Sequence, residues 1–211
     1  DLIRCGNIPV TELRRIYRQE AGSRIIRNAH ALNEGRMPEL KNPPAGEKTD
    51  FYWMEQEDPD HVAQLMARMV ATRIPATFGF DPMRDIQVLT PMNRGACGTV
   101  ALNELLQNTL NGTGGREAVI GNKVLRENDR VMQTSNNYDK GVFNGELGSV
   151  KHIDPERRSL YVQFADAGVS YDWAEADQLR LSYAVTVHKS QGNEFPAVIV
   201  PVLTQHYVML Q

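Results

Sequence analysis

Asp85-Ile-Gln-Val-Leu-Thr90 is a short apolar stretch that runs directly into the polar loop Pro91-Met-Asn-Arg-Gly95. Apolar residues then recur at helical spacing over residues 100–110, so this part of the chain predicts a strand, a loop and a helix. In parallel α/β sheets, ligands meet the chain at the carboxyl ends of strands. We therefore expect Thr90, Asn93 and Arg94 at a functional edge, with a purely helix-capping loop as the alternative.

The N-terminal part predicts further helices. Residues 22–34 carry apolar side chains at helical spacing and end at a glycine, and the Pro-, Gly- and Lys-rich residues 41–49 predict an exposed loop. The apolar residues 50–55 predict a short strand. A second helix is expected to begin after Asp60, which would be its N-cap. Its apolar side chains form one stripe over residues 62–70, and we expect the methionines of this stripe in the core.

The pattern changes to short strands and tight turns after residue 111. Residues 160–164 and 169–173 alternate between apolar and polar side chains on either side of a turn, which predicts a β-hairpin. Residues 129–134 and 147–153 add further strands, and together they have the size of a small closed barrel.

The α/β pattern resumes at Ser182. Residues 197–200 form an apolar run that predicts a strand buried on both faces, as in a parallel sheet. The fold class we expect is therefore α/β, with an all-β module inserted into it.

Composition excludes several classes of protein. The chain has 211 residues, 41% of them apolar, and 23 basic against 26 acidic side chains, for a net charge of −3. Disorder is excluded by this balance. The apolar run 197–203 is too short to span a membrane, and Cys5 and Cys97 form neither a disulfide framework nor a zinc pattern with the histidines. We expect a cytoplasmic protein without a membrane partner, in which any nucleic-acid role uses a local groove rather than a basic face.

The densest polar cluster is Thr186-Val-His-Lys-Ser-Gln-Gly-Asn-Glu194. Its side chains offer donors to phosphate oxygens, and Gly192 lets the backbone approach a ligand closely. The glycines of a phosphate-binding loop are absent from it, and a loop that caps a helix is the alternative. The acidic residues Asp172, Glu175 and Asp177 are interpreted as a solvated surface, and no metal site is expected.

Four motifs together resemble the second half of a RecD-like helicase, a family of superfamily 1 with TraA-type relatives. The matching stretches follow in order along nearly the whole chain: Ile16-Tyr-Arg-Gln19 with the helix Ser23–His30, Val88-Leu-Thr-Pro-Met-Asn-Arg-Gly95, Gly141-Val-Phe-Asn-Gly-Glu-Leu-Gly148, and Tyr183-Ala-Val-Thr-Val-His-Lys-Ser-Gln-Gly-Asn-Glu-Phe195.

The resemblance implies a division into domains and an activity. Residues 1–111 and 183–211 would form the second RecA-like lobe of a P-loop NTPase motor, with residues 112–182 an inserted SH3-like barrel. Such enzymes hydrolyse ATP with Mg²⁺ and move 5′ to 3′ on single-stranded DNA, in DNA repair or recombination.

The resemblance also implies roles for individual residues. Arg18 is the expected arginine finger that reaches the γ-phosphate, and Gln19, Gly192 and Glu194 lie toward the nucleotide. The expected contacts to DNA are Thr90, Pro91, Asn93, Asn136, Asn137, Tyr138, Asn144, Thr186, His188, Ser190 and Gln191. Tyr138 would stack on a base, whereas a turn-stabilising role for the asparagines stays open.

The chain departs from the family pattern at both ends. The Walker A loop, the acidic Mg²⁺-binding motif and the final T-x-x-T-R motif are absent. We therefore expect a fragment that needs the N-terminal RecA-like lobe of the same protein as its partner and is inactive alone as an ATPase. The alternative is a non-catalytic adaptor that binds nucleic acid or protein through its barrel.

Overall fold

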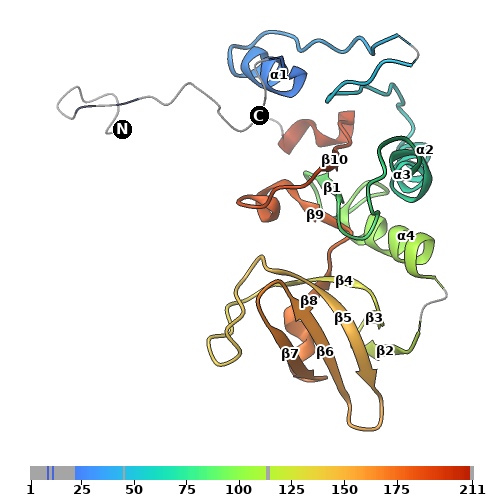
Figure 1. Cartoon of the computed structure of the whole chain (residues 1–211), viewed down its shortest axis with the longest axis vertical. Helices are drawn as coiled ribbons and strands as arrows, with labels where there is room; N and C mark the ends of the chain where they lie inside the picture. Colours follow the sequence, from blue (N-terminus) through green and yellow to red (C-terminus); the bar gives the residue numbers. More distant parts are fainter. Residues whose placement is uncertain (1–8, 10, 12–21, 45, 113–114, 210–211) are drawn as a thin grey trace. The chain divides into compact units, whose positions relative to one another are not determined.

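The computed structural model describes residues 9, 11, 22–44, 46–112 and 115–209 (Figure 1). The chain divides into two compact units, Asp1–Glu55 and Gln56–Gln211, which are described separately. None of the helices in the described part of the chain is long and apolar enough to cross a membrane.

The first unit contains the predicted helix, α1 (Arg24–Asn33), but not the predicted strand over residues 50–55. The side chain of Asn42 forms hydrogen bonds with both backbone groups of Trp53. Asn42 Nδ2 donates to Trp53 O (2.6 Å), and Trp53 N donates to Asn42 Oδ1 (2.8 Å). The Asn42 amide therefore takes the place that a neighbouring strand would have at Trp53. Asp50 instead accepts a hydrogen bond from the backbone N–H of Arg24 in the first turn of α1 (3.0 Å).

The second unit begins with a nearly continuous helical segment made of α2 (Pro59–Arg68), the π-helical turn η1 (Met69–Arg73) and α3 (Ile74–Phe78). Its N-cap is Asp58 rather than the predicted Asp60, because His61 N donates to Asp58 Oδ1 (2.8 Å). The structure confirms that the methionines belong to the core, since Met66 is buried and Met69 packs against the same cluster.

A parallel sheet lies at the centre of the second unit (Figure 1). The strands are β1 (Ile86–Thr90), β9 (Ala184–Thr186) and β10 (Ala197–Ile199), in the order β10-β1-β9. The predicted strand, loop and helix are confirmed, because β1 leads through residues 91–98 into α4 (Thr99–Asn111). Leu102 and Leu106 of α4 are buried in the core of this sheet.

The prediction that residues 197–200 are buried on both faces is wrong. Within the described residues β10 pairs only with β1, so it is an edge strand. Val198 and Val200 are 46% and 50% exposed. An unbroken apolar run indicates a strand but not whether both of its faces are covered.

The residues between α4 and β9 form an all-β module with its own core. The hairpin β2 (Glu117–Ile120) and β3 (Lys123–Arg126) stands beside a five-stranded antiparallel sheet of order β7-β6-β5-β4-β8. The predicted hairpin is confirmed as β6 and β7. The sheet is built from β4 (Arg130–Gln133), β5 (Leu147–Asp154), β6 (Ser159–Phe164), β7 (Gly168–Asp172) and β8 (Leu179–Leu181), with the 3₁₀ turn η2 (Glu175–Gln178) before β8.

Candidate nucleic-acid interface

The parallel pairing of β1 with β9 brings two of the predicted motifs to the same edge of the sheet. Thr90, the last residue of β1, is in register with Thr186, the last residue of β9. Residues 91–98 leave the sheet beside the turn η3 (Val187–Ser190). The two polar loops therefore start from neighbouring strand ends, where parallel sheets form their ligand sites.

Thr90 faces into its own loop rather than toward solvent. Its side chain is buried, and its Oγ1 donates to Cys97 O (2.6 Å). At Gly98 a Cβ atom would lie 2.5 Å from the carbonyl oxygen of Arg94, so only glycine fits this close backbone approach. Thr90 therefore shapes the loop, and its hydroxyl group is not presented at the surface.

Pro91 is half-buried and Asn93 is exposed on the outside of the same loop. The carbonyl oxygen of Asn93 accepts from Val100 N (3.2 Å), and its Oδ1 accepts from Thr99 Oγ1 (2.9 Å). The Asn93 residue is exposed, so its amide NH₂ group can donate to a ligand while the oxygen binds Thr99.

The η3 turn presents a second set of polar groups. His188, Lys189 and Gln191 are exposed, whereas Thr186 and Ser190 are half-buried. The Ser190 hydroxyl donates to Val187 O (2.8 Å) and so stabilises the turn.

Of the residues that were expected near the nucleotide, the structure describes Gly192 and Glu194. Gly192 follows η3 with φ +92°, a backbone conformation that favours glycine. Gly192 and Glu194 are exposed. Arg18 and Gln19 lie outside the described residues.

The loop between β4 and β5, residues 134–146, is shaped by two asparagine side chains. Asn136 Oδ1 accepts from Asn144 N (2.9 Å), and Asn137 Oδ1 accepts from Lys140 N (3.2 Å). Asn137 Nδ2 also donates to Gln178 Oε1 (3.2 Å). These contacts favour the turn-stabilising role that was left open for the asparagines.

Two aromatic rings project from this loop. Tyr138 is 77% exposed and Phe143 is 44% exposed, and their rings meet edge to face with centroids 5.9 Å apart. Phe143 was not among the predicted contacts, although an aromatic side chain in the Val-Phe-Asn-Gly turn was a usable signal. Exposed aromatic rings on a structured loop offer faces on which bases can stack.

The base of this loop is anchored inside the β module by buried amides. Gln133 Nε2 donates to Gln178 Oε1 (2.9 Å), and the hydroxyl of Tyr171 donates to Gln133 Oε1 (3.0 Å). Burial raises the pKa of Tyr171 to about 12, so its hydroxyl remains a donor at neutral pH. The aromatic pair is thus held by a fixed support.

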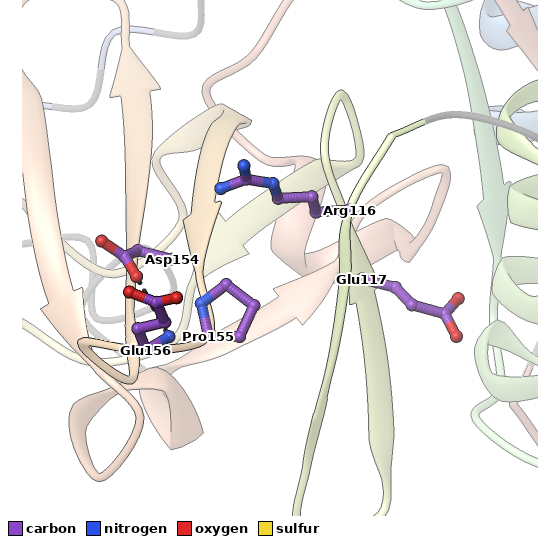
Figure 2. A pocket seen from close by; sticks show the side chains of 5 residues that line it. All are labelled: Arg116, Glu117, Asp154, Pro155 and Glu156. Atoms are coloured by element: carbon purple, nitrogen blue, oxygen red, sulfur yellow. Dashed lines mark hydrogen bonds between the residues drawn. The ribbon is translucent and has the colours of Figure 1, made fainter.

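The β module also has a shallow pocket away from these loops (Figure 2). Figure 2 shows Arg116 on the same side as Asp154, whereas Glu117 points away from both. Arg116 Nη1 donates to Ile153 O (3.3 Å), and Asp154 Oδ1 accepts from Glu156 N (3.1 Å). With the carboxylates of Asp154 and Glu156 on the side of its one arginine, this pocket does not suit a phosphate backbone.

The acidic residues around η2 are involved in contacts within the module. Glu175 forms an ion pair with Lys140 (2.9 Å) and accepts from Asp172 N (3.0 Å), which lowers the pKa of Glu175. Across the described ranges, no group of three or more His, Cys, Asp or Glu side chains is arranged to hold a metal ion.

Two family models match the chain. The model for the SH3 domain of ATP-dependent RecD-like DNA helicases matches residues 102–164, from α4 to the end of β6. The model for the UvrD-like helicase C-terminal domain matches residues 181–211, which contain β9, η3 and β10.

A curated relative matches across both regions. The chain is 36% identical over 203 residues to the ATP-dependent RecD2 DNA helicase of Deinococcus radiodurans, covering 96% of this chain. Together with the two family models, this match supports a RecD-like helicase fragment. The chain spans 26% of the length of that relative.

Solved structures of Pif1 helicases share a distant likeness with this RecD-like chain. A Bacteroides Pif1 helicase in complex with ADP-AlF3 and ssDNA gives a TM-score of 0.43 at 16% identity, covering 66% of this chain and 38% of that one. A structure of two coordinating Pif1 helicases at forked dsDNA gives 0.43 at 16% identity, covering 71% and 42%.

Proposed function

We propose that this chain is part of an ATP-dependent DNA helicase that moves 5′ to 3′ along single-stranded DNA in repair or recombination. In this proposal the parallel sheet is part of the second motor lobe. The strand-end loops hold the DNA backbone, and the aromatic loop of the β module stacks on bases.

The observation that carries the proposal is the register of Thr90 with Thr186, which puts two exposed polar loops at neighbouring strand ends. Asn93 and His188 then present donors from the two loops, and Lys189 adds a positive charge. Phosphate oxygens are acceptors with negative charge, so this combination suits a nucleic-acid backbone. The similarity to a RecD2 helicase over nearly the whole chain supports the same assignment.

The domain division that goes with this function places the motor lobe in residues 1–111 and 183–211 and the SH3-like module in residues 112–182. Supporting this division, α4 ends at Asn111, and β8 and β9 lie on either side of residues 182–183.

For the nucleotide site we propose Arg18 as the arginine finger and Gln19, Gly192 and Glu194 as further residues that lie toward the nucleotide. Mg²⁺ and most of the phosphate contacts are assigned to the first motor lobe, where the family resemblance places the Walker A loop and the acidic Mg²⁺-binding motif. Arg18 would stabilise charge that develops on the γ-phosphate. By itself, the 211-residue chain should not hydrolyse ATP.

The nucleotide role is tested by the single-strand-stimulated ATPase of the full-length helicase. Arg18→Ala should lower kcat by about 10³-fold or more, the usual contribution of an arginine finger. Arg27→Ala is the matched control, since the Arg27 side chain is 60% exposed on α1 and pairs only loosely with Glu39 (3.8 Å). Equal activity of the two variants would contradict the role of Arg18. The prediction that the 211-residue chain alone is inactive has its own test. It would be contradicted by an ATPase activity of this chain that survives repurification and disappears with Arg18→Ala.

The DNA role is tested by fluorescence anisotropy with a labelled single strand at several salt concentrations. His188→Ala should weaken binding, whereas His152→Ala, which changes an exposed histidine on β5, should not. Binding that is insensitive to His188 and depends only on the β module would instead favour a non-catalytic adaptor.

A further inference from the structure

A buried arginine connects the β module to the parallel sheet. Arg130, the first residue of β4, is only 7% exposed. Its Nη1 donates to Ile86 O (2.7 Å) and its Nη2 donates to Gln87 Oε1 (2.7 Å), both on the central strand β1. No carboxylate among the described residues lies within ion-pair distance of its guanidinium, although the charge of Asp81 favours the cation from farther away; the direct partners of the buried guanidinium are the two acceptors on β1.

Gln87 extends the contact to the chain segment that returns to the sheet. Gln87 is fully buried, and its Nε2 donates to Ser182 O (3.2 Å) and to Tyr183 O (3.1 Å). Ser182 N in turn donates to Arg130 O (3.0 Å). The hydrogen bonds therefore form a closed circuit through β4, β1 and the segment before β9.

Asp129 makes a second set of contacts across the same junction. Its carboxylate accepts from Gln107 Nε2 (2.6 Å) and Asn111 Nδ2 (2.7 Å), both on α4, and from the Tyr183 hydroxyl (2.9 Å). Asp129 is fully buried, and burial raises its pKa while these donors oppose the shift. The neighbouring residues Asp129 and Arg130 thus connect the module to the helix and to the central strand of the motor sheet.

The directional bonds at this junction favour one orientation of the two sheets. A rotation of the module would leave a guanidinium, a carboxylate and several amides buried without partners, which is strongly unfavourable. A purely apolar interface, by contrast, can slide without losing directional bonds. The buried guanidinium, carboxylate and amides of this network have partners, whereas the buried hydroxyl of Ser182 has none, so it is the directional bonds of the former that favour one arrangement.

We propose that Arg130 is a positioning residue that makes the β module and the parallel sheet one rigid body. It would hold the Tyr138 and Phe143 loop at a fixed distance from the loops after β1 and β9, so that one strand of DNA binds both surfaces together. The part of this inference that concerns DNA rests on the proposed function, whereas the rigidity does not.

The rigidity is tested with two spin labels in the full-length protein without nucleic acid. Labels at Glu104→Cys on α4 and Asp166→Cys in the β6–β7 turn occupy exposed positions on either side of the junction. Cys5 and other reactive cysteines are replaced by serine; Cys97 is buried and its pKa is raised to about 11, so it resists labelling. Arg130→Met should broaden the distance distribution at least about twofold, since it removes the directional bonds while keeping an unbranched, flexible apolar side chain in the buried site.

Arg180→Met is the matched control, because Arg180 lies opposite Met132 on β8 but is exposed and donates only to Asp177 O and Leu179 O. The Arg180→Met variant should keep the narrow distribution of spin-label distances seen in the unmodified protein. If Arg130→Met does not fold, Gln87→Met removes the acceptor of Arg130 Nη2 and should broaden the distribution as well. An unchanged width in a folded Arg130→Met or Gln87→Met variant would overturn the proposal.

The consequence for DNA is tested with one short single strand that covers a single surface and one long strand that covers both. Linking two sites raises affinity through effective concentration, so Arg130→Met should weaken binding of the long strand by about tenfold or more and leave the short strand within about twofold. Equal losses for both strands would indicate a general structural defect and overturn the positioning role. If the unmodified protein binds neither strand, the proposed function fails, while the distance measurement still decides the rigidity.

Discussion

The side chain of Asn103 binds both backbone groups of Ala184. Asn103 Nδ2 donates to Ala184 O (2.7 Å), and Ala184 N donates to Asn103 Oδ1 (3.0 Å), with both residues buried. Ala184 begins β9, an edge strand of the parallel sheet in the described residues. An amide on α4 thus replaces the hydrogen bonds of a further strand and holds β9 in place, two residues before Thr186.

Asn103→Ala should destabilise the protein by about 2–4 kcal/mol. The substitution leaves the buried N–H and C=O of Ala184 without partners, and each such group costs about 1–3 kcal/mol. Urea unfolding followed by circular dichroism measures the change in the free energy of unfolding. Glu104→Ala, at the adjacent exposed position of the same helix, should stay within about 0.5 kcal/mol. Similar values for the two variants would show that the Asn103 amide is not needed at this edge.

The buried histidine His206 should make stability depend on pH near neutrality. His206 is fully buried, and Leu203 N donates to its Nδ1 (3.2 Å). Burial lowers the pKa of His206 below its usual 6.5, with the Pro201 carbonyl partly opposing the shift. The unfolded chain therefore binds a proton more readily than the folded one, so the stabilising contribution is complete above pH 6.5 and is lost as the pH falls below it.

The measurement for His206 is the free energy of unfolding between pH 5 and 8 for the unmodified protein and for His206→Asn, which keeps an acceptor but does not titrate. The stability advantage of the histidine should shrink as the pH falls from about 6.5. An advantage that is constant over this range would show that His206 is not the titrating group.

Much of the fold could be predicted from the sequence because it depends on local apolar patterns. The helix α1, the succession of β1, loop and α4, and the hairpin of β6 and β7 all follow from the spacing of apolar side chains. Whether an apolar segment pairs with other strands, and with how many of them, depends on residues far away in the sequence. Residues 50–55 have no strand because Asn42 satisfies Trp53, and β10 proved to be an edge strand.

The loops of the candidate site could be predicted from the sequence, but how they lie relative to one another could not. The motifs identified the loops after β1 and β9, and only the parallel register brought Thr90 and Thr186 together. The buried polar junction was missed, although Gln87 inside an apolar strand was a visible signal. Its partner Arg130 is 43 residues away in sequence, and no local pattern predicts that pairing.

Lys189 should contribute to DNA binding mainly through its charge. It is exposed in η3 beside His188. A lysine that neutralises one phosphate releases about one counterion, so Lys189→Ala should reduce the slope of log Kd against log salt by about 1. Anisotropy titrations at a series of salt concentrations measure the slope. Lys151→Ala on β5 is the matched exposed lysine and should leave the slope unchanged; a parallel reduction in both variants would argue against a specific contact at η3.

Tyr138 should contribute to affinity by stacking rather than by charge. Its ring is 77% exposed and is braced by Phe143, so a base can stack on it without rearranging the loop. Tyr138→Ala should weaken binding of a single strand by about 1–3 kcal/mol with the salt dependence unchanged, since the ring carries no charge. Tyr138→Phe should retain most of the affinity. Tyr161→Ala, which removes a less exposed tyrosine on β6, serves as the control. A loss with Tyr138→Phe as large as that with Tyr138→Ala would show that the hydroxyl, which accepts from Asn136 Nδ2 (3.3 Å), matters more than the ring.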